Sequence, residues 1–521
     1  MVETDLYDDA MSQLKHISRF ITCVALAMAS VSALAQKPVI SSISKTTAEN
    51  EEIITFQGNG FGTSAADLSV SFGASKGAIN FVSDQLMEVK APSGATYDKI
   101  GISHIPSGLT EYTAKNFLLS FGGDHGFGPA KLAGQKDFNA ESGLYDLCLC
   151  DFDGNKKVDI ATANDNANSI TLLENTSSAP GLATLTFNKI TVAQTPQILI
   201  NTRSIHVTCG DLNGDGKPEL VVSEGGSTGD RIFIYRNVSA GAGSFAFAIQ
   251  SIKLTGKKVK RVKISDLDRD GKPELVVTNQ SGNNVTILVN QSTPAAIAFS
   301  TSHITLTIPG AASTDGLALD DLNGDNLPEV ITSQFLTATS NVFVLKNTST
   351  LGNITFATPT TLSIGGTVVN IKVGDLDNDQ KPEIAVTQLL GSAISIFLNQ
   401  SNSGNILFAS PFPIATDERP WGLDFGDLDG DQKPDISIAS LTNKSLTILN
   451  NESTPGSLSF QKSSKPTTFI NRHVLIGDLD GDAKPDVAYT SVDDNNNGIS
   501  ASKVSIFRNT ACPKPVVDPA G

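Results

Sequence analysis

From about residue 121 to residue 511, apolar and polar positions follow one recurring order. An apolar strand leads into an acidic nine-residue loop, and a second β-branched strand leaves it, as at residues 220–222 and 436–438. A polar turn then leads to a third strand that ends in Asn, such as 285–290, and a weaker fourth strand begins near a phenylalanine. Short β-branched runs bounded by turn residues predict antiparallel strands, here four to each unit.

The acidic loop occurs seven times, and the first aspartates of successive loops are 60, 55, 55, 54, 52 and 51 residues apart. The loops span residues 151–159, 211–219, 266–274, 321–329, 375–383, 427–435 and 478–486. A repeated four-stranded unit of this length is typical of a propeller blade. We therefore predict an all-β chain with a seven-bladed β-propeller at residues 121–511.

The two ends of the array predict how the ring closes. The seventh unit stops after its third strand, at 504–509, whereas an additional strand near 127–132 precedes the first unit. Phe127 lies 24 residues before Asp151, the same distance as Phe187 before Asp211. We expect this N-terminal strand to complete the last blade, because closure removes exposed strand edges.

Residues 36–120 have a different pattern and contain no acidic loop. Runs at 38–40, 53–56, 68–72 and 86–89 predict short strands of an antiparallel sandwich. Together with the turn Gly-Asn-Gly-Phe-Gly at 58–62, this stretch resembles the IPT/TIG immunoglobulin-like domain. The resemblance implies a β-sandwich that serves as a spacer or a second contact surface.

The N-terminal residues 1–35 read as a secretory signal peptide, with Met11 as a possible true start. Lys15 and Arg19 precede an apolar run that ends at Ala33-Leu34-Ala35. This run is short for a transmembrane span, so we expect a protein that is secreted or on the cell surface, without membrane insertion after signal removal. Residues 512–521 are interpreted as a tail or linker.

Four cysteines remain after signal removal: Cys148, Cys150, Cys209 and Cys512. A disulfide is compatible with export, but their spacing does not assign a pair. The interpretation favoured from the sequence is that they are small apolar core residues.

The formal charge of −16 comes largely from the loops, which hold 25 of the 54 acidic residues. Such a charge argues against nucleic acid or anionic membranes as partners. Seven divalent cations would add +14 and bring the chain close to neutrality. We therefore interpret the acidity as a signature of metal sites rather than as a generally acidic surface.

In each loop, positions 1, 3 and 5 are Asp or Asn and position 9 is Asp or Glu. Alternate side chains of a tight loop converge on one hard cation, and a donor set made only of oxygen favours Ca²⁺ over Zn²⁺. The predicted ligands are Asp151, Asp153, Asn155, Asp159, Asp211, Asn213, Asp215, Glu219, Asp266, Asp268, Asp270, Glu274, Asp321, Asn323, Asp325, Glu329, Asp375, Asp377, Asp379, Glu383, Asp427, Asp429, Asp431, Asp435, Asp478, Asp480, Asp482 and Asp486.

These loops and the blade pattern around them, from about 121 to 509, resemble FG-GAP/VCBS repeats, the units of integrin α-subunit propellers and of many exported bacterial proteins. The resemblance implies up to seven structural Ca²⁺ ions held by positions 1, 3, 5 and 9. Asn155 and Val158 depart from the pattern and weaken the first site, while Asn213 and Asn323 remove a charge from the second and fourth. We expect the third, fifth, sixth and seventh sites to bind most tightly.

The loops on the propeller face opposite the metal loops are the predicted ligand surface. Its candidate residues are Tyr145, Arg203, Arg419, Trp421 and Arg472. Trp421, the only tryptophan, suits a sugar ring or a partner side chain, with packing between blades as the alternative.

No pattern typical of a catalytic site stands out, so we do not expect an enzyme. We expect a monomeric, exported, calcium-binding adhesion or recognition protein that presents the loop face to a protein or glycan. The alternatives are a polysaccharide lyase or hydrolase, and a purely structural surface module. Sequons such as those at Asn175 and Asn290 recur with the repeat, and we attribute them to turn chemistry rather than to glycosylation.

Overall fold

The computed structural model describes residues 37–123, 128–190, 204–225, 229–254, 258–310, 313–335, 340–492 and 502–511. The predicted signal peptide and tail lie outside these ranges. The described part is built from strands and two short 3₁₀ helices, η1 (Ala65–Asp67) and η2 (Pro129–Lys131). Within it, no helix has the length and apolar character needed to span a bilayer.

The N-terminal unit is a two-sheet sandwich, as predicted. One sheet has the order β1 (Val39–Ile43), β3 (Ile53–Asn59), β7 (Leu86–Lys90) and β6 (Ala78–Ser83). The other has the order β2 (Thr47–Glu49), β9 (Leu109–Ser120), β8 (Asp98–His104), β4 (Leu68–Phe72) and β5 (Ser75–Lys76).

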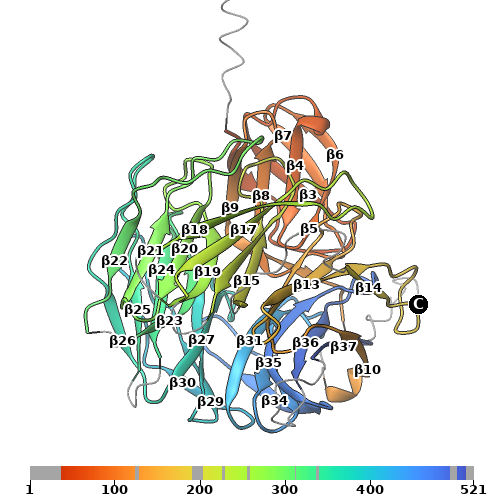
Figure 1. Ribbon diagram of the computed structural model, residues 1–521, viewed down its shortest axis with the longest axis vertical. Helices are drawn as coiled ribbons and strands as arrows, with labels where there is room; N and C mark the ends of the chain where they lie inside the picture. The colour runs from red at the N-terminus through yellow and green to blue at the C-terminus, as the bar shows by residue number, and fades with distance from the viewer. Residues whose placement is uncertain are drawn as a thin grey trace, which may run out of the picture.

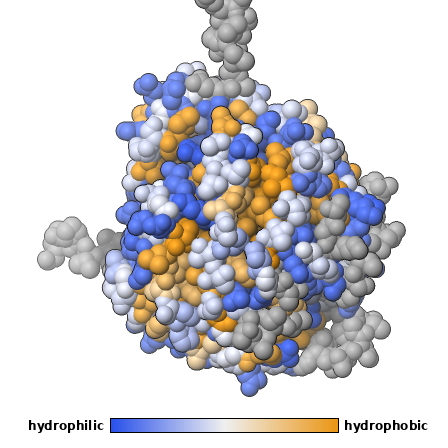
Figure 2. Space-filling model, turned by 90° about the vertical axis from the view of Figure 1, so that its left-hand side faces the viewer, coloured by the Kyte–Doolittle hydropathy of each residue, from blue (hydrophilic) through white to orange (hydrophobic). Residues whose placement is uncertain are grey.

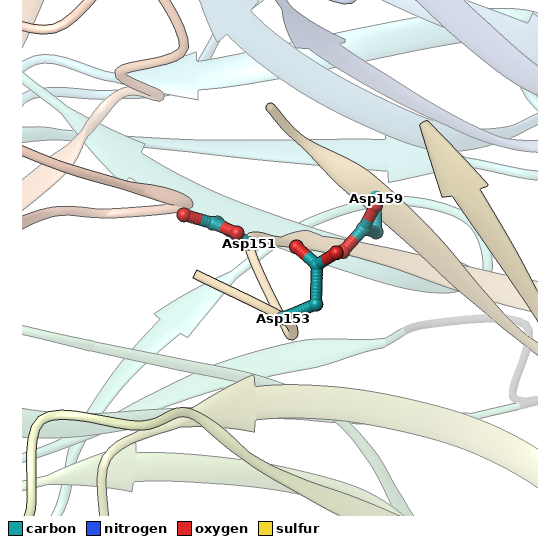
Figure 3. Close-up of side chains that lie close together, drawn as sticks. All are labelled: Asp151, Asp153 and Asp159. Carbon is teal, nitrogen blue, oxygen red and sulfur yellow. The ribbon is translucent and has the colours of Figure 1, made fainter. Parts of the chain in front are cut away.

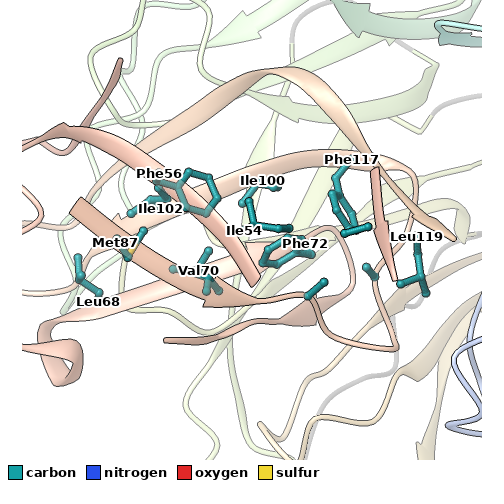
Figure 4. Packing of buried hydrophobic residues seen from close by; sticks show 14 of the residues in the cluster. Ile54, Phe56, Leu68, Val70, Phe72, Met87, Ile100, Ile102, Phe117 and Leu119 are labelled. Carbon is teal, nitrogen blue, oxygen red and sulfur yellow. The ribbon is translucent and has the colours of Figure 1, made fainter. Parts of the chain in front are cut away.

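The sandwich core comes from alternate residues of these strands. Ile54 and Phe56 of one sheet face Val70 and Phe72 of the other, and all four are almost fully buried (Figure 4). The rings of Phe72 and Phe117 meet edge to face at 4.9 Å. The period-two pattern of the sequence thus produces a core of its own for this unit.

Seven further sheets have four antiparallel strands each. The first strands are β11 (Leu144–Cys150), β15 (Ser204–Gly210), β19 (Val259–Ser265), β23 (Thr314–Asp320), β27 (Val368–Gly374), β31 (Pro420–Gly426) and β35 (Ile470–Gly477). The second strands are β12 (Asp159–Asn164), β16 (Glu219–Glu224), β20 (Glu274–Asn279), β24 (Glu329–Gln334), β28 (Glu383–Gln388), β32 (Asp435–Ser440) and β36 (Asp486–Val492).

The third strands are β13 (Ser169–Asn175), β17 (Arg231–Asn237), β21 (Asn284–Leu288), β25 (Asn341–Leu345), β29 (Ala393–Phe397), β33 (Ser445–Asn451) and β37 (Lys503–Asn509). The fourth strands are β14 (Phe187–Ile190), β18 (Phe247–Lys253), β22 (Ile304–Thr307), β26 (Thr360–Ser363), β30 (Phe412–Ala415), β34 (Phe460–Pro466) and β10 (Leu132–Asn139). Each first strand contacts that of the next blade, and β11 contacts β35, so the seven sheets form a closed ring (Figure 1).

The ring closes through the N-terminal strand. Leu132 of β10 pairs with Asn509 of β37, and Asn139 pairs with Lys503. The predicted closure is therefore confirmed, but the predicted position near 127–132 is wrong, because the strand begins only at Leu132. Phe127, on which the spacing argument rested, lies outside the described residues.

We expected each fourth strand to begin near a phenylalanine, but the blades differ in this respect. Phe187, Phe247 and Phe460 begin their strands, as expected. In the third, fourth and fifth blades, the phenylalanine forms only an isolated bridge to the asparagine after the third strand, for example Phe299 to Asn290. The longer strand starts several residues later, after a short break.

The sandwich is docked on the propeller face that carries the acidic loops. The N–H of Asp151 donates to the carbonyl of Ala74 at 2.8 Å, and the N–H of Thr110 donates to the carbonyl of Gly271 at 2.9 Å. At the fifth loop, the N–H of Asp375 donates to the hydroxyl oxygen of Tyr97 at 3.0 Å. The sandwich, red-orange in Figure 1, therefore lies on the metal-loop side of the propeller, and its residues share a cleft with the first strands that line the channel.

Candidate metal centres and the opposite face

Each acidic loop is wound around the carboxylate of its first aspartate. In the sixth loop, Oδ1 of Asp427 accepts hydrogen bonds from the N–H groups of Gly430 (2.6 Å) and Asp431 (3.1 Å), and Oδ2 accepts one from Gln432 (2.9 Å). Gly430 and Gln432 have φ of 78° and 70°, in the left-handed region where glycine carries no steric cost. The frequent glycine at position 4 follows from this winding.

The ninth residue ties the loop to the blade. In the sixth loop, Asp435 Oδ2 accepts a hydrogen bond from the N–H of Leu428 at 2.9 Å, and Oδ1 accepts one from Asn451 at 2.8 Å. Asp435 is fully buried. Its carboxylate thus links the start of the loop to the end of the third strand, and the same pair of contacts recurs in the first loop at Asp159.

Five loops bring three carboxylate oxygens within 4.8 Å of one another, at positions 1, 3 and 9. Figure 3 shows Asp151, Asp153 and Asp159 of the first loop. The other groups are Asp266, Asp268 and Glu274; Asp375, Asp377 and Glu383; Asp427, Asp429 and Asp435; and Asp478, Asp480 and Asp486. The second and fourth loops carry Asn213 and Asn323 at position 3, so they lack one carboxylate.

Position 5, also predicted as a ligand, is not part of these five groups. In the sixth loop, Oδ1 of Asp431 accepts a hydrogen bond from the N–H of Lys433 at 2.9 Å. The corresponding bond recurs in the first loop, from the N–H of Lys157 to Asn155 at 2.7 Å. The geometry therefore assigns position 5 a role in the shape of the loop, and its role as a ligand stays a prediction.

Burial and mutual repulsion disfavour charge on these carboxylates. Burial raises the pKa of Asp151 to about 6 and that of Asp427 to about 7. For Glu274, burial and then the charge of Asp266 raise the pKa to about 9. Oδ1 of Asp266 and Oδ1 of Asp375 are buried without a hydrogen-bond partner. An oxygen-only donor set of this kind fits a hard divalent cation, which would supply the missing charge and partners.

Two loops of the described residues hold a cationic side chain from outside the nine-residue motif. Lys37 from the start of the sandwich donates to the carbonyl of Arg269 at 2.7 Å, and its Nζ lies 3.7 Å from Oδ2 of Asp266. In the seventh loop, Arg508 forms ion pairs with Asp480 and Asp482. Both side chains compete with a metal ion for these carboxylates. In the fifth and sixth loops, Lys381 and Lys433 of the motif itself lie 3.8 and 3.6 Å from the position-5 carboxylates of Asp379 and Asp431, outside the groups at positions 1, 3 and 9. We therefore now expect the fifth and sixth sites to bind most tightly.

One asparagine per blade joins neighbouring metal loops into a ring. Its Nδ2 donates to the carbonyl at position 2 of the preceding blade's loop, at 2.7 to 2.9 Å. The donors are Asn175, Asn237, Asn290, Asn347, Asn399, Asn451 and Asn509, and the acceptors in the same order are Leu479, Phe152, Leu212, Leu267, Leu322, Leu376 and Leu428. The sequon asparagines Asn175 and Asn290 belong to this set and are buried, which supports the turn interpretation over glycosylation.

On the opposite face, three of the five predicted ligand residues lie together. The Trp421 ring meets the Tyr145 ring edge to face at 6.4 Å, and the guanidinium carbon of Arg472 lies 5.0 Å from the Tyr145 centroid. Nε1 of Trp421 is buried without a hydrogen-bond partner. Arg419 is exposed, and Arg203 lies outside the described residues.

A buried cluster beneath these rings was missed from the sequence. The carboxylate of Asp146 lies between two histidines: it contacts Nδ1 of His206 and lies 3.1 Å from Nδ1 of His473. Burial lowers the pKa of His473 to about 4, although Asp146 acts against it. Nε2 of His473 is buried without a partner. Asp146 and His206 belong to the consecutive first and second blades, whereas His473 belongs to the seventh, so the ring closure brings His473 to the other two.

The structure corrects the favoured interpretation of the cysteines. Cys150 and Cys209 form a disulfide between the first strands of neighbouring blades, with their Cα atoms 6.6 Å apart. Cys148 is free and buried, as expected of an apolar core residue. Cys512 lies outside the described residues.

Comparison with known families agrees with the architecture. Residues 151–222, 266–332, 321–386 and 389–438 match the FG-GAP-like repeat, and residues 38–116 match the IPT/TIG domain. No curated protein matches the chain.

Several solved structures are similar in fold. An auxiliary nutrient binding protein from Bacteroides thetaiotaomicron VPI-5482 is 11% identical over 91% of this chain and 98% of its own, with a TM-score of 0.34. An Agrocybe aegerita lectin that recognises non-reducing terminal N-acetylglucosamine is 12% identical (87% and 98% covered, TM-score 0.41). A Lactobacillus plantarum protein is 13% identical (77% and 97% covered, TM-score 0.44). At these identities and TM-scores, the three structures carry no information on what this chain binds.

Proposed function

This chain is an FG-GAP-repeat β-propeller protein with an N-terminal IPT/TIG domain, and we propose that it is an exported recognition protein that binds a protein or glycan with the propeller face opposite its metal loops. In this proposal, Ca²⁺ ions in the acidic loops are structural, the chain acts as a monomer, and it binds its ligand without catalysing a reaction.

The observation that carries the proposal is the place of the IPT/TIG domain. Ala74 and Tyr97 accept hydrogen bonds from the first and fifth metal loops, and Thr110 donates one to the third, which holds the domain against the metal-loop face. That end of the channel is therefore covered by the chain itself, and among the described residues the sandwich leaves the mouth with Trp421 and Tyr145 uncovered.

The chemistry of this mouth suits recognition. The half-buried rings of Trp421 and Tyr145, with the guanidinium of Arg472 over the Tyr145 ring, place aromatic surface and a cationic donor side by side. Aromatic rings and arginine are the residues enriched in binding hot spots. By contrast, β22 on the outer rim alternates between half-buried and exposed residues, β26 is mostly exposed, and polar and apolar residues are interspersed on that side (Figure 2).

Export is supported by the Cys150–Cys209 disulfide, because disulfides persist in oxidising compartments and are rare in the cytosol. The donor set supports calcium, and extracellular sites with dissociation constants of about 10⁻⁴–10⁻³ M are filled at extracellular calcium levels. The sequence pattern of a signal peptide points the same way.

The test uses residues 36–521 in calcium on arrays of glycans and of extracellular proteins. Trp421→Ala and Arg472→Ala are each expected to weaken binding at least tenfold, since hot-spot truncations cost roughly 1.4 kcal/mol or more. Leu351→Ala, at an exposed leucine in the loop between β25 and β26, is the matched control. If both variants bind as the parent does, or if the parent binds nothing on either array, the structural-module alternative is favoured.

Catalysis has its own test. We expect no release of reducing or unsaturated ends when the same protein is incubated with a panel of polysaccharides. Release that survives purification to homogeneity would identify an enzyme instead.

A further inference from the structure

A cleft of about 520 Å³ lies between the sandwich and the propeller. Its lining runs from exposed residues such as Ser42 and Asn326 to Lys263 and Lys372 on the channel strands β19 and β27. Clefts of this size between domains are common sites for small molecules. The lining also includes Asp151, Asp211 and Asp266, the first aspartates of three metal loops, but Lys263 and Lys372 belong to neither the metal loops nor the proposed recognition face.

The two lysines stand in one layer of the channel. Lys263 and Lys372 each precede the first aspartate of their loop by three residues, and Ala318 has the equivalent position in the blade between them. Because alanine is small, its blade leaves the space between the two ammonium groups open. All three residues line the cleft.

The two lysines differ in their partners. Nζ of Lys372 lies 2.5 Å from Oδ1 of Asp424. Lys263 has no ion pair or hydrogen bond within the described part of the chain, and burial and the charge of Lys372 lower its pKa. Lys263 is half-buried, and the charges of Asp98 and Asp146 act on it from beyond ion-pair distance, so the cost of placing its ammonium group in the channel is only partly offset. An anion placed between the two lysines offsets it further.

The sandwich side of the cleft offers complementary polar groups. Oδ1 of Asp98 accepts a hydrogen bond from the N–H of Lys99 at 2.8 Å, while its Oδ2 and the hydroxyl of Tyr112 have no hydrogen bond among the described residues. A carboxylate oxygen and a phenol suit the hydroxyl groups of a ligand. Asp98 lies beyond ion-pair distance of Lys263, which leaves room for a molecule between the two walls.

We propose that this cleft binds a small hydroxylated carboxylic acid, with its carboxylate at Lys263 and its hydroxyl groups at Asp98 and Tyr112. The site is built jointly by the two domains, so neither forms it alone. The proposal is independent of recognition at the opposite face, because it involves neither Trp421 nor Arg472.

The experiment is calorimetric titration of residues 36–521, in calcium, with D-gluconate and with D-sorbitol. Sorbitol has the same carbon chain with a CH2OH group in place of the carboxylate, so the pair isolates the contribution of the anion. Gluconate is expected to bind and sorbitol to bind at least tenfold more weakly, since hydrogen bonds to charged groups are worth about ten- to a hundredfold. Acetate, which lacks the hydroxyl groups, is also expected to bind more weakly than gluconate.

Lys263→Met is expected to weaken gluconate binding by about tenfold to a hundredfold. The matched control is Lys253→Met, at a lysine whose side chain is 68% exposed and lies outside the cleft. If Lys263→Met does not fold by circular dichroism, Lys263→Gln and Asp98→Asn are measured in its place, and each is expected to weaken binding. Absence of gluconate binding to the parent, equal binding of sorbitol or acetate, or unchanged binding by the variants would overturn the proposal.

Discussion

The side-chain amide of Asn399 donates a hydrogen bond of 2.9 Å to the carbonyl of Leu322, which lies 77 residues earlier and in the neighbouring blade. The same amide donates to the carbonyl of Pro382 at 2.9 Å, and its oxygen accepts from the N–H of Ser401 at 2.8 Å. One buried side chain thus holds two metal loops and the turn that follows its own strand.

Replacing this asparagine is expected to cost stability. Asn399→Ala removes three hydrogen bonds and leaves buried carbonyl groups without partners, so the free energy of unfolding should fall by about 2–4 kcal/mol. Equilibrium denaturation with urea measures the change. Asn353→Ala, at an exposed asparagine of the same region, serves as the control and should stay within about 0.5 kcal/mol of the parent. Equal losses in the two variants would contradict the role assigned to Asn399.

The Cys150–Cys209 disulfide should stabilise the first two blades against each other. It links residues 59 positions apart, and the chain-entropy treatment assigns a loop of that length about 4 kcal/mol. Cys150→Ser with Cys209→Ser should therefore lower the melting temperature clearly, and a reducing agent should do the same to the parent. Cys148→Ser keeps the disulfide and tests the effect of a serine in the same strand. If the reducing agent left the melting temperature of the parent protein unchanged, the result would argue against the disulfide.

Removal of Arg508 should improve the seventh metal site. Its guanidinium group pairs with Asp480 and Asp482, so a metal ion has to displace it or share its partners. Arg508→Gln is expected to tighten calcium binding at the seventh site by a few-fold to tenfold, measured by calorimetric titration. The control is Arg236→Gln, at an arginine that donates to the carbonyl of Ala295 and has no ion pair with an acidic loop among the described residues. Weaker calcium binding by Arg508→Gln would show that the arginine supports the site.

The metal-free protein should lose stability as the pH rises. The folded-state pKa values of the loop carboxylates lie above their unfolded values, at about 6 for Asp151 and about 9 for Glu274. Such groups bind more protons when folded, so their contribution is complete below about pH 4 and is lost as the pH rises through the folded values. In chelator, the melting temperature should fall between about pH 5 and pH 9. Calcium should abolish this fall, and an unchanged slope in calcium would contradict the assignment.

Much of the fold could be predicted from the sequence, because the signals for its strands and loops are local and recur in every blade. The nine-residue loops mark every junction between first and second strands, and the incomplete seventh unit signals that β10 (Leu132–Asn139) completes it. The exact start of β10 was not readable, because no spacing rule distinguishes Phe127 from Leu132 as the point where pairing with Asn509 begins.

What the sequence did not reveal depends on contacts between distant elements. Cys150 and Cys209 pair because two blades place their Cα atoms 6.6 Å apart, a distance that spacing along the chain does not give. The position of the sandwich on the metal loops depends on single contacts such as Tyr97 with Asp375. Likewise, Lys37 and Arg508 enter two loops from outside the nine-residue motif. The motif alone therefore does not predict that these side chains compete with a metal ion at the third and seventh sites.

The central claim is that calcium in the acidic loops stabilises the propeller. The most direct measurement is thermal unfolding of residues 36–521 in excess calcium and in chelator, with the bound calcium counted in parallel. A site filled at ten to a hundred times its dissociation constant contributes roughly 1.4–2.7 kcal/mol, so several sites should raise the melting temperature clearly, with four to seven ions bound. An unchanged melting temperature together with no bound metal would contradict the account.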